Sequence, residues 1–183
     1  GLTSADALLT GTDNIAIGRL SFSASTDGAD NIAIGRSALA VSGNDGDTNI
    51  AIGLAALGTG DVAGAGNIGI GASALTALTS GTNNIAMGLT AADALLGGTD
   101  NVAIGRLAFS ASTDGADNIA IGRSALAVSG NDGDGNIAIG LAALGTGDVS
   151  GINNIGLGAS ALTALTSGTN NIAMGLTAAD ALL

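Results

Sequence analysis

The sequence contains no cysteine, proline, histidine, tryptophan or tyrosine, and its only aromatic residues are Phe22 and Phe109. Lysine and glutamate are missing too, since all fifteen acidic residues are Asp and all four basic residues are Arg. Most side chains that serve as general acids, bases or nucleophiles are therefore absent, and the sequence predicts a protein that is not an enzyme. Any core must be built from aliphatic residues, because aromatic rings are almost lacking.

The charge balance excludes further classes of protein. The formal net charge of −11 argues against a nucleic-acid partner, which requires a basic footprint. No apolar run approaches the roughly 18 residues of a membrane span, so we expect no membrane insertion in this segment. Hydrophobic residues make up 46% of the chain, too many for a disordered protein. The exclusive use of Asp indicates that negative charge is confined to turns.

A long repeat of 87 residues organises what is present. Residues 2–88 and 89–175 differ at nine positions, and residues 176–183 begin a third copy. We therefore expect one continuous solenoid over residues 1–183. The chain starts and stops in the same phase of the repeat, which indicates an excerpt of a longer array.

A shorter repeat lies inside the long one. The octapeptide Gly-x-x-Asn-aliphatic-small-aliphatic-Gly, first seen as residues 11–18, occurs ten times at spacings of 17 or 18 residues. Its alternation of large and small residues predicts a short strand, and the flanking glycines predict turns. A second apolar stretch, such as residues 37–41, predicts a second strand in each unit. The fold class is thus all-β: a parallel β-solenoid, or β-roll, of about ten coils with two short strands per coil.

This reading assigns a role to each motif position. We expect the large residues to fill a flat core: Ile15, Ile17, Ile32, Ile34, Leu39, Ile50, Ile52 and Leu57. On the opposite side of the strand, asparagines are expected to form a hydrogen-bonded ladder, or else only to tolerate the turn: Asn14, Asn31, Asn49, Asn67 and Asn84. The small residues there form a smooth column that predicts an interface between chains, or a surface that meets water: Ala16, Ala33, Ala51, Gly69 and Ala86.

The pattern G-x-x-N-h-A-h-G followed by "AL" resembles the head repeats of trimeric autotransporter adhesins, the YadA-like left-handed parallel β-roll. It also resembles the N-T-A-I-G arrays of phage tail fibres and related bacterial surface proteins. The resemblance covers essentially the whole chain and implies three chains around an axis. The coils here are longer than the roughly 14 residues of the adhesin repeat, and no ligand-binding motif of that family is visible.

Asp-rich turns are the only candidate for bound ions. Calcium could be held by two pairs of carboxylates, with solvated turns as the alternative: Asp45 with Asp47, and Asp132 with Asp134. No other cofactor is expected. Thr12, Thr82, Thr99 and Thr169 share a register that would suit ice binding, but other residue types interrupt their column.

The sequence thus predicts a structural protein, the shaft of an extracellular fibre or filament on a cell surface or virion. Its partners would be copies of itself, as a homotrimer, an end-to-end filament, or both. One alternative is an adhesin head or a phage receptor-binding module with an unknown host ligand. A weaker alternative is an ice-binding or laterally packing solenoid.

Overall fold

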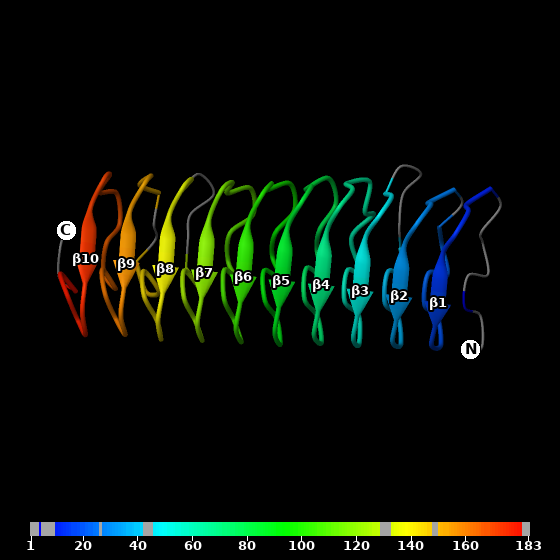
Figure 1. Cartoon of the computed structure of the whole chain (residues 1–183), viewed down its shortest axis with the longest axis horizontal. Coiled ribbons are helices and arrows are strands. Elements are labelled where there is room, and N and C mark those ends of the chain that lie inside the picture. Colours follow the sequence, from blue (N-terminus) through cyan, green and yellow to red (C-terminus); the bar gives the residue numbers. More distant parts are fainter. Residues whose placement is uncertain are drawn as a thin grey trace.

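A computed structural model describes residues 4, 10–25, 27–41, 46–128, 133–147 and 150–180. The chain winds into a rod of stacked coils, which follow one another in chain order from one end of the rod to the other (Figure 1). The described residues form ten three-residue strands, one per coil, and all have the same place in the octapeptide. They are β1 (Ile15–Ile17), β2 (Ile32–Ile34), β3 (Ile50–Ile52), β4 (Ile68–Ile70), β5 (Ile85–Met87), β6 (Val102–Ile104), β7 (Ile119–Ile121), β8 (Ile137–Ile139), β9 (Ile155–Leu157) and β10 (Ile172–Met174).

The ten strands make one parallel sheet in chain order, β1 to β10. Each strand pairs in register with the next, so that Ile15 lies beside Ile32 and Ala16 beside Ala33. Equivalent motif positions therefore form straight columns along the rod. The predicted parallel β-solenoid of ten coils, with 17 or 18 residues in each, is confirmed.

The second strand predicted in each coil is wrong. The residues two and four positions after the closing glycine have positive φ, for example 57° at Ser37 and 48° at Leu39, so this wall is a chain of turns. Its backbone still bonds from coil to coil: Ser37 N–H donates to the Arg19 carbonyl and Leu39 N–H to the Ala56 carbonyl, both at 3.0 Å. The wall buries two consecutive residues in each coil, such as Ala38 and Leu39, whereas a strand would bury every second one.

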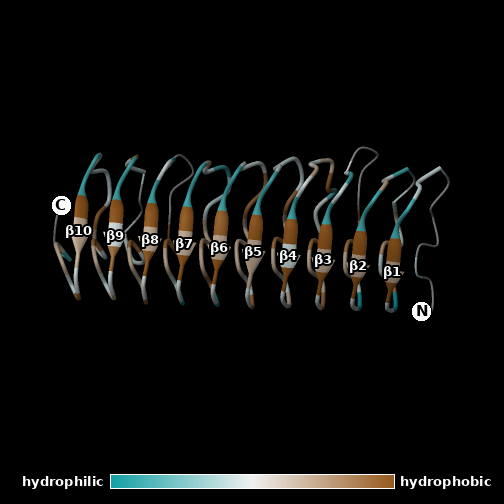
Figure 2. Ribbon diagram, viewed as in Figure 1, coloured by the Kyte–Doolittle hydropathy of each residue, from teal (hydrophilic) through white to brown (hydrophobic). Residues whose placement is uncertain are grey.

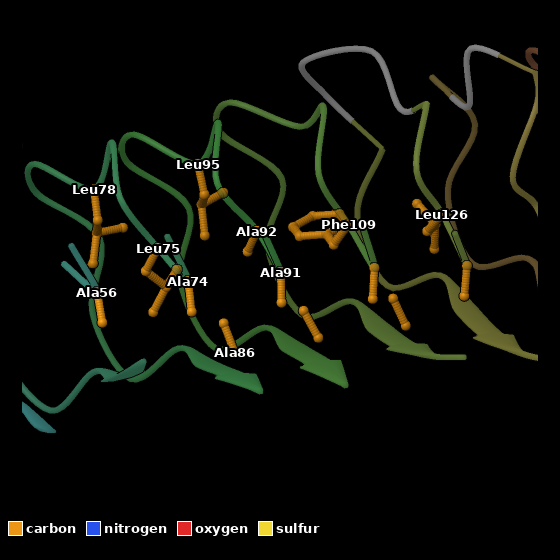
Figure 3. Close-up of a cluster of buried hydrophobic side chains, with 14 of the residues drawn as sticks. Ala56, Ala74, Leu75, Leu78, Ala86, Ala91, Ala92, Leu95, Phe109 and Leu126 are labelled. Carbon is orange, nitrogen blue, oxygen red and sulfur yellow. The ribbon is translucent and has the colours of Figure 1, made fainter. Parts of the chain in front are cut away.

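The core lies between the sheet and this turn wall. Leu39 and Leu57 are fully buried, as predicted, and the same column continues through Phe109 and Leu126 (Figure 3). Where Ala92 replaces the large residue, Leu95 is fully buried beside it. The sheet contributes only small residues to this core. Large aliphatic side chains thus enter from the turn wall, and methyl groups from the strands.

The predicted orientation of the strands is inverted. Ile15 and Ile17 are 47% and 57% exposed, and Ile32, Ile34, Ile50 and Ile52 are partly exposed, whereas Ala33, Ala51, Gly69 and Ala86 are buried. Ala16, in the first coil, is partly buried against the core. A Cβ atom on Gly69 would lie 3.4 Å from Leu57 Cγ, so the walls are too close for two layers of large residues. The small column is therefore core, and the interface between chains predicted there is wrong.

In the part of the chain that the structure describes, no helix has the length and apolar character of a membrane span.

Candidate interaction surfaces

A column of asparagines joins successive coils, as predicted. Asn101 Oδ1 accepts a bond from the backbone N–H of Asn118 at 3.0 Å, while Asn101 Nδ2 donates to the Gly115 carbonyl at 2.7 Å. Adjacent amides also bond directly, as Asn101 Nδ2 does to Asn84 Oδ1 at 2.9 Å. The same side-chain-to-backbone pattern begins at Asn14 and continues through Asn31, Asn49, Asn67 and Asn84. Each buried amide satisfies backbone groups of the next coil that would otherwise lack a partner.

The two glycines of the octapeptide are explained by the same stacking. The first glycine supplies the carbonyl that receives the asparagine amide of the preceding coil, as Gly115 does for Asn101. The closing glycine has φ near +130° and stacks on its own equivalent: a Cβ on Gly88 would lie 2.6 Å from the Gly105 carbonyl oxygen. Both glycines mark places where one backbone passes directly over the next. The motif is therefore required by stacking itself.

The outer side of the sheet is a continuous apolar face. It consists of the two residues in each strand that flank the buried small residue, mostly Ile, with Val102, Leu157, Met87 and Met174 as variants. Hydrophobic residues fill the strands along the whole rod, and a hydrophilic segment precedes each of them (Figure 2). The exposed fraction reaches 40% at Met87 and at Ile139 in the interior of the rod. We call this surface the apolar face.

Charged residues border the apolar face on two sides. All four arginines of the chain directly follow the closing glycine of a coil: Arg19, Arg36, Arg106 and Arg123. In the same four coils an aspartate directly precedes the motif asparagine, at the other end of the strand: Asp13, Asp30, Asp100 and Asp117. All eight residues are exposed. We call the two sets the arginine flank and the aspartate flank.

The two flanks are formed by stacked neighbours. The N–H of Ser37 bonds the Arg19 carbonyl, and the N–H of Asp30 bonds the Thr12 carbonyl, both at 3.0 Å. Arg19 therefore lies beside Arg36, one coil away, and Asp13 beside Asp30. Like charges so placed repel each other. The sequence carries a signal of this arrangement, because arginine occurs only in coils whose motif asparagine follows an aspartate.

The predicted calcium residues do not gather into a site among the described residues. Asp47 Oδ1 accepts the backbone N–H of Ala29 at 2.7 Å, and Asp134 Oδ1 accepts that of Ala116 at the same distance. Asp45 and Asp132 lie outside the described residues. Within the described ranges, no three acidic side chains come together as a metal would require. These two carboxylates fasten one coil to the preceding one.

One other acidic side chain stands out. Burial raises the pKa of the Asp93 carboxyl above its ordinary value, and a hydrogen bond from its own backbone N–H partly offsets the rise. Asp93 follows Ala92 in the turn wall and is partly buried. The environment therefore favours its neutral form more than water does.

Comparison of the chain with known protein families, with curated proteins and with solved structures found no match.

Proposed function

We propose that this chain is a shaft segment of an extracellular fibre, with a mechanical rather than a catalytic role. The single observation that supports this function most is the unbroken stacking of ten equivalent coils, held by a continuous asparagine column. Such a rod lengthens by a fixed amount per coil, as a spacer requires. Its exposed acidic turns favour solubility.

The rod length provides the test. Adding one 87-residue unit contributes five coils, which should lengthen the rod by about 24 Å at the usual strand spacing. Small-angle scattering on the chain with and without the added unit measures this change. An unchanged maximum dimension would contradict the shaft function. Surface labelling of cells or virions with an antibody to the chain would test the proposed location.

A specific observation favours lateral packing as a second candidate function. The apolar face covers one whole side of the rod, and a solitary spacer would not need it. A laterally packing solenoid would cover that face with another rod. The homotrimer implied by the family resemblance stays a prediction, and it would now have to use a surface other than the buried alanine column.

A further inference from the structure

We propose that the apolar face binds a second copy of this chain, with the two rods parallel and in register and their sheets face to face. This inference specifies the partner for the lateral association considered above. It rests on the apolar face and on the arrangement of charges beside it.

The size of the apolar face is in the range of a small interface. The apolar face is ten strands long, with about 4.8 Å between strands, and three residues wide, at about 3.3 Å per residue. Its area is therefore roughly 480 Å² per copy. Two such faces bury about 1,000 Å², near the lower end of specific protein interfaces. In the interior of the rod the outward side chains of the strands are partly buried, because they pack against their neighbours in the same column. Together they form a surface against which another sheet can pack face to face.

The charged flanks select the relative direction of the two rods. Rotating a copy by half a turn about an axis parallel to the rod brings the faces together and exchanges the ends of the strands. The arginine flank of each copy then lies over the aspartate flank of the other. An antiparallel arrangement would instead set arginine flank against arginine flank. Parallel rods alone therefore pair opposite charges.

The same charges select the register. Arginines and aspartates both occur in the first, second, sixth and seventh coils, so every arginine meets an aspartate when the coils are level. A slip of one coil keeps half of these pairs, and a slip of two coils keeps none. Among the described residues no ion pair joins these four arginines to an acidic side chain, and the stacked like charges of each flank repel one another. A partner in register supplies the missing opposite charge.

The separation between packed sheets also fits this arrangement. Face-to-face sheets lie about 10 Å apart, a gap that a long arginine side chain can cross to reach an aspartate. Three faces of about 10 Å width closed around one axis would place each sheet only about 3 Å from that axis, too close for isoleucine side chains. The geometry therefore favours two copies rather than three.

A variant with shifted register tests the role of the charges without changing composition. It moves the arginines two coils along their own flank: Arg19→Leu, Arg36→Ala, Leu54→Arg, Ala72→Arg, Arg106→Leu, Arg123→Ala, Leu141→Arg and Ala159→Arg. Net charge and residue content remain those of the natural chain. We expect the variant to fold, by circular dichroism, but to associate about tenfold more weakly in sedimentation experiments at low salt. Equal association of the two chains would overturn the proposal.

Cross-linking tests direction and register on the natural charges, using a chain that has no cysteine of its own. In the proposed pair, the first strand position of one copy faces the third position of the other at the same level. A mixture of Ile68→Cys and Ile70→Cys chains should therefore be joined by a short bifunctional thiol reagent, which spans the gap of about 10 Å between packed sheets. In antiparallel rods, Ile68→Cys would instead pair with Ile119→Cys, and that product would overturn the proposal.

The mass of the assembly completes the experiment. We expect twice the chain mass of 17.0 kDa in solution. A monomer at all concentrations, or a species of three chains, would overturn the paired arrangement. Either result would leave the shaft function standing if the rod still lengthened with added repeats, so failure of the pair and failure of the shaft can be told apart.

Discussion

At the scale of the residue, asparagine is the side chain that holds one coil on the next. Its amide has a donor and an acceptor at one end of a short stem, so a single side chain can satisfy both a carbonyl and an N–H of the adjacent coil. Asn101 does this for Gly115 and Asn118. A serine could supply both functions only through one oxygen atom, and an aspartate would bring a buried charge.

The Asn101→Ala variant should lose about 2–4 kcal/mol of unfolding free energy, because two buried backbone groups lose the asparagine amide. Chemical denaturation measures the loss. Asn171→Ala is the matched control, since Asn171 lies in the last strand-bearing coil and its amide donates back to Asn154 Oδ1 at 3.0 Å. We expect the control to cost less than about 1 kcal/mol. Equal losses of unfolding free energy for both variants would show that the bonds from Asn101 to the next coil do not stabilise the rod.

Asp93 gives a prediction about pH. The pKa of Asp93 is raised in the folded chain, so ionisation of this carboxyl disfavours folding. The loss of stability is absent below about pH 3.8, the ordinary pKa of an aspartate, because the carboxyl is then protonated in both states. The loss appears as the pH rises through the pKa of the folded chain. Asp93→Asn should therefore raise the melting temperature relative to the natural chain at pH 7 and leave it unchanged at pH 3. A difference of the same size at both values would contradict the assignment to ionisation.

At the scale of the element, each strand is a thin wall with a small residue inside and large residues outside. Ala103 is 1% exposed while Ile104, next to it on β6, is 37% exposed. The opposite wall supplies the bulk of the core through Phe109 and its equivalents (Figure 3). Size, rather than hydrophobicity, therefore decides which side of the strand faces inward.

The Ala103→Leu variant should cost at least about 1–3 kcal/mol, because the added carbons have no room between the walls. By contrast, Ile104→Ala should cost less than about 1.5 kcal/mol at concentrations where the chain is monomeric, since only part of its surface is buried. Thermal unfolding of the two variants at low protein concentration compares them. If the isoleucine change were the more damaging, the strand orientation described here would be wrong.

The turn that ends each strand can be tested in the same way. Gly88→Ala forces a Cβ to within 2.6 Å of the Gly105 carbonyl oxygen, whereas a Cβ on Gly175 finds its nearest neighbour, Ala178 Cβ, at 3.9 Å. Both glycines have positive φ, 141° and 128°, so the conformational strain is shared and only the clash differs. Gly88→Ala should destabilise the rod by several times more than Gly175→Ala in denaturation experiments. A similar loss of stability in both variants would mean that the strain of the positive φ, and not the clash with the next coil, causes the destabilisation.

At the scale of the whole molecule, stability accumulates along one dimension. Each strand contacts only the strands on either side of it, and among the described strands no contact joins distant parts of the rod. Removing residues 89–175 joins two points of equal phase and takes away five coils. The denaturant dependence of the unfolding free energy should fall to about half, because about half of the surface is buried. An unchanged dependence would mean that the rod does not unfold as one unit.

The sequence by itself determined the repeat, the coil length and the column positions, because a motif that recurs every 17 or 18 residues repeats one backbone geometry in stacked coils. It offered the asparagine ladder as one of two roles for that column, and the structure decided for the ladder. The sequence also identified Leu39 and Leu57 as core residues. Only the tertiary structure decided which side of each strand faces inward. Alternation in Ile15-Ala16-Ile17 gives two faces but does not say which is buried. The answer depends on the distance to the opposite wall, where left-handed turns at Leu39 and its equivalents bring large side chains up to the sheet. That distance leaves room for alanine inside and turns the isoleucines outward, where they form the apolar face.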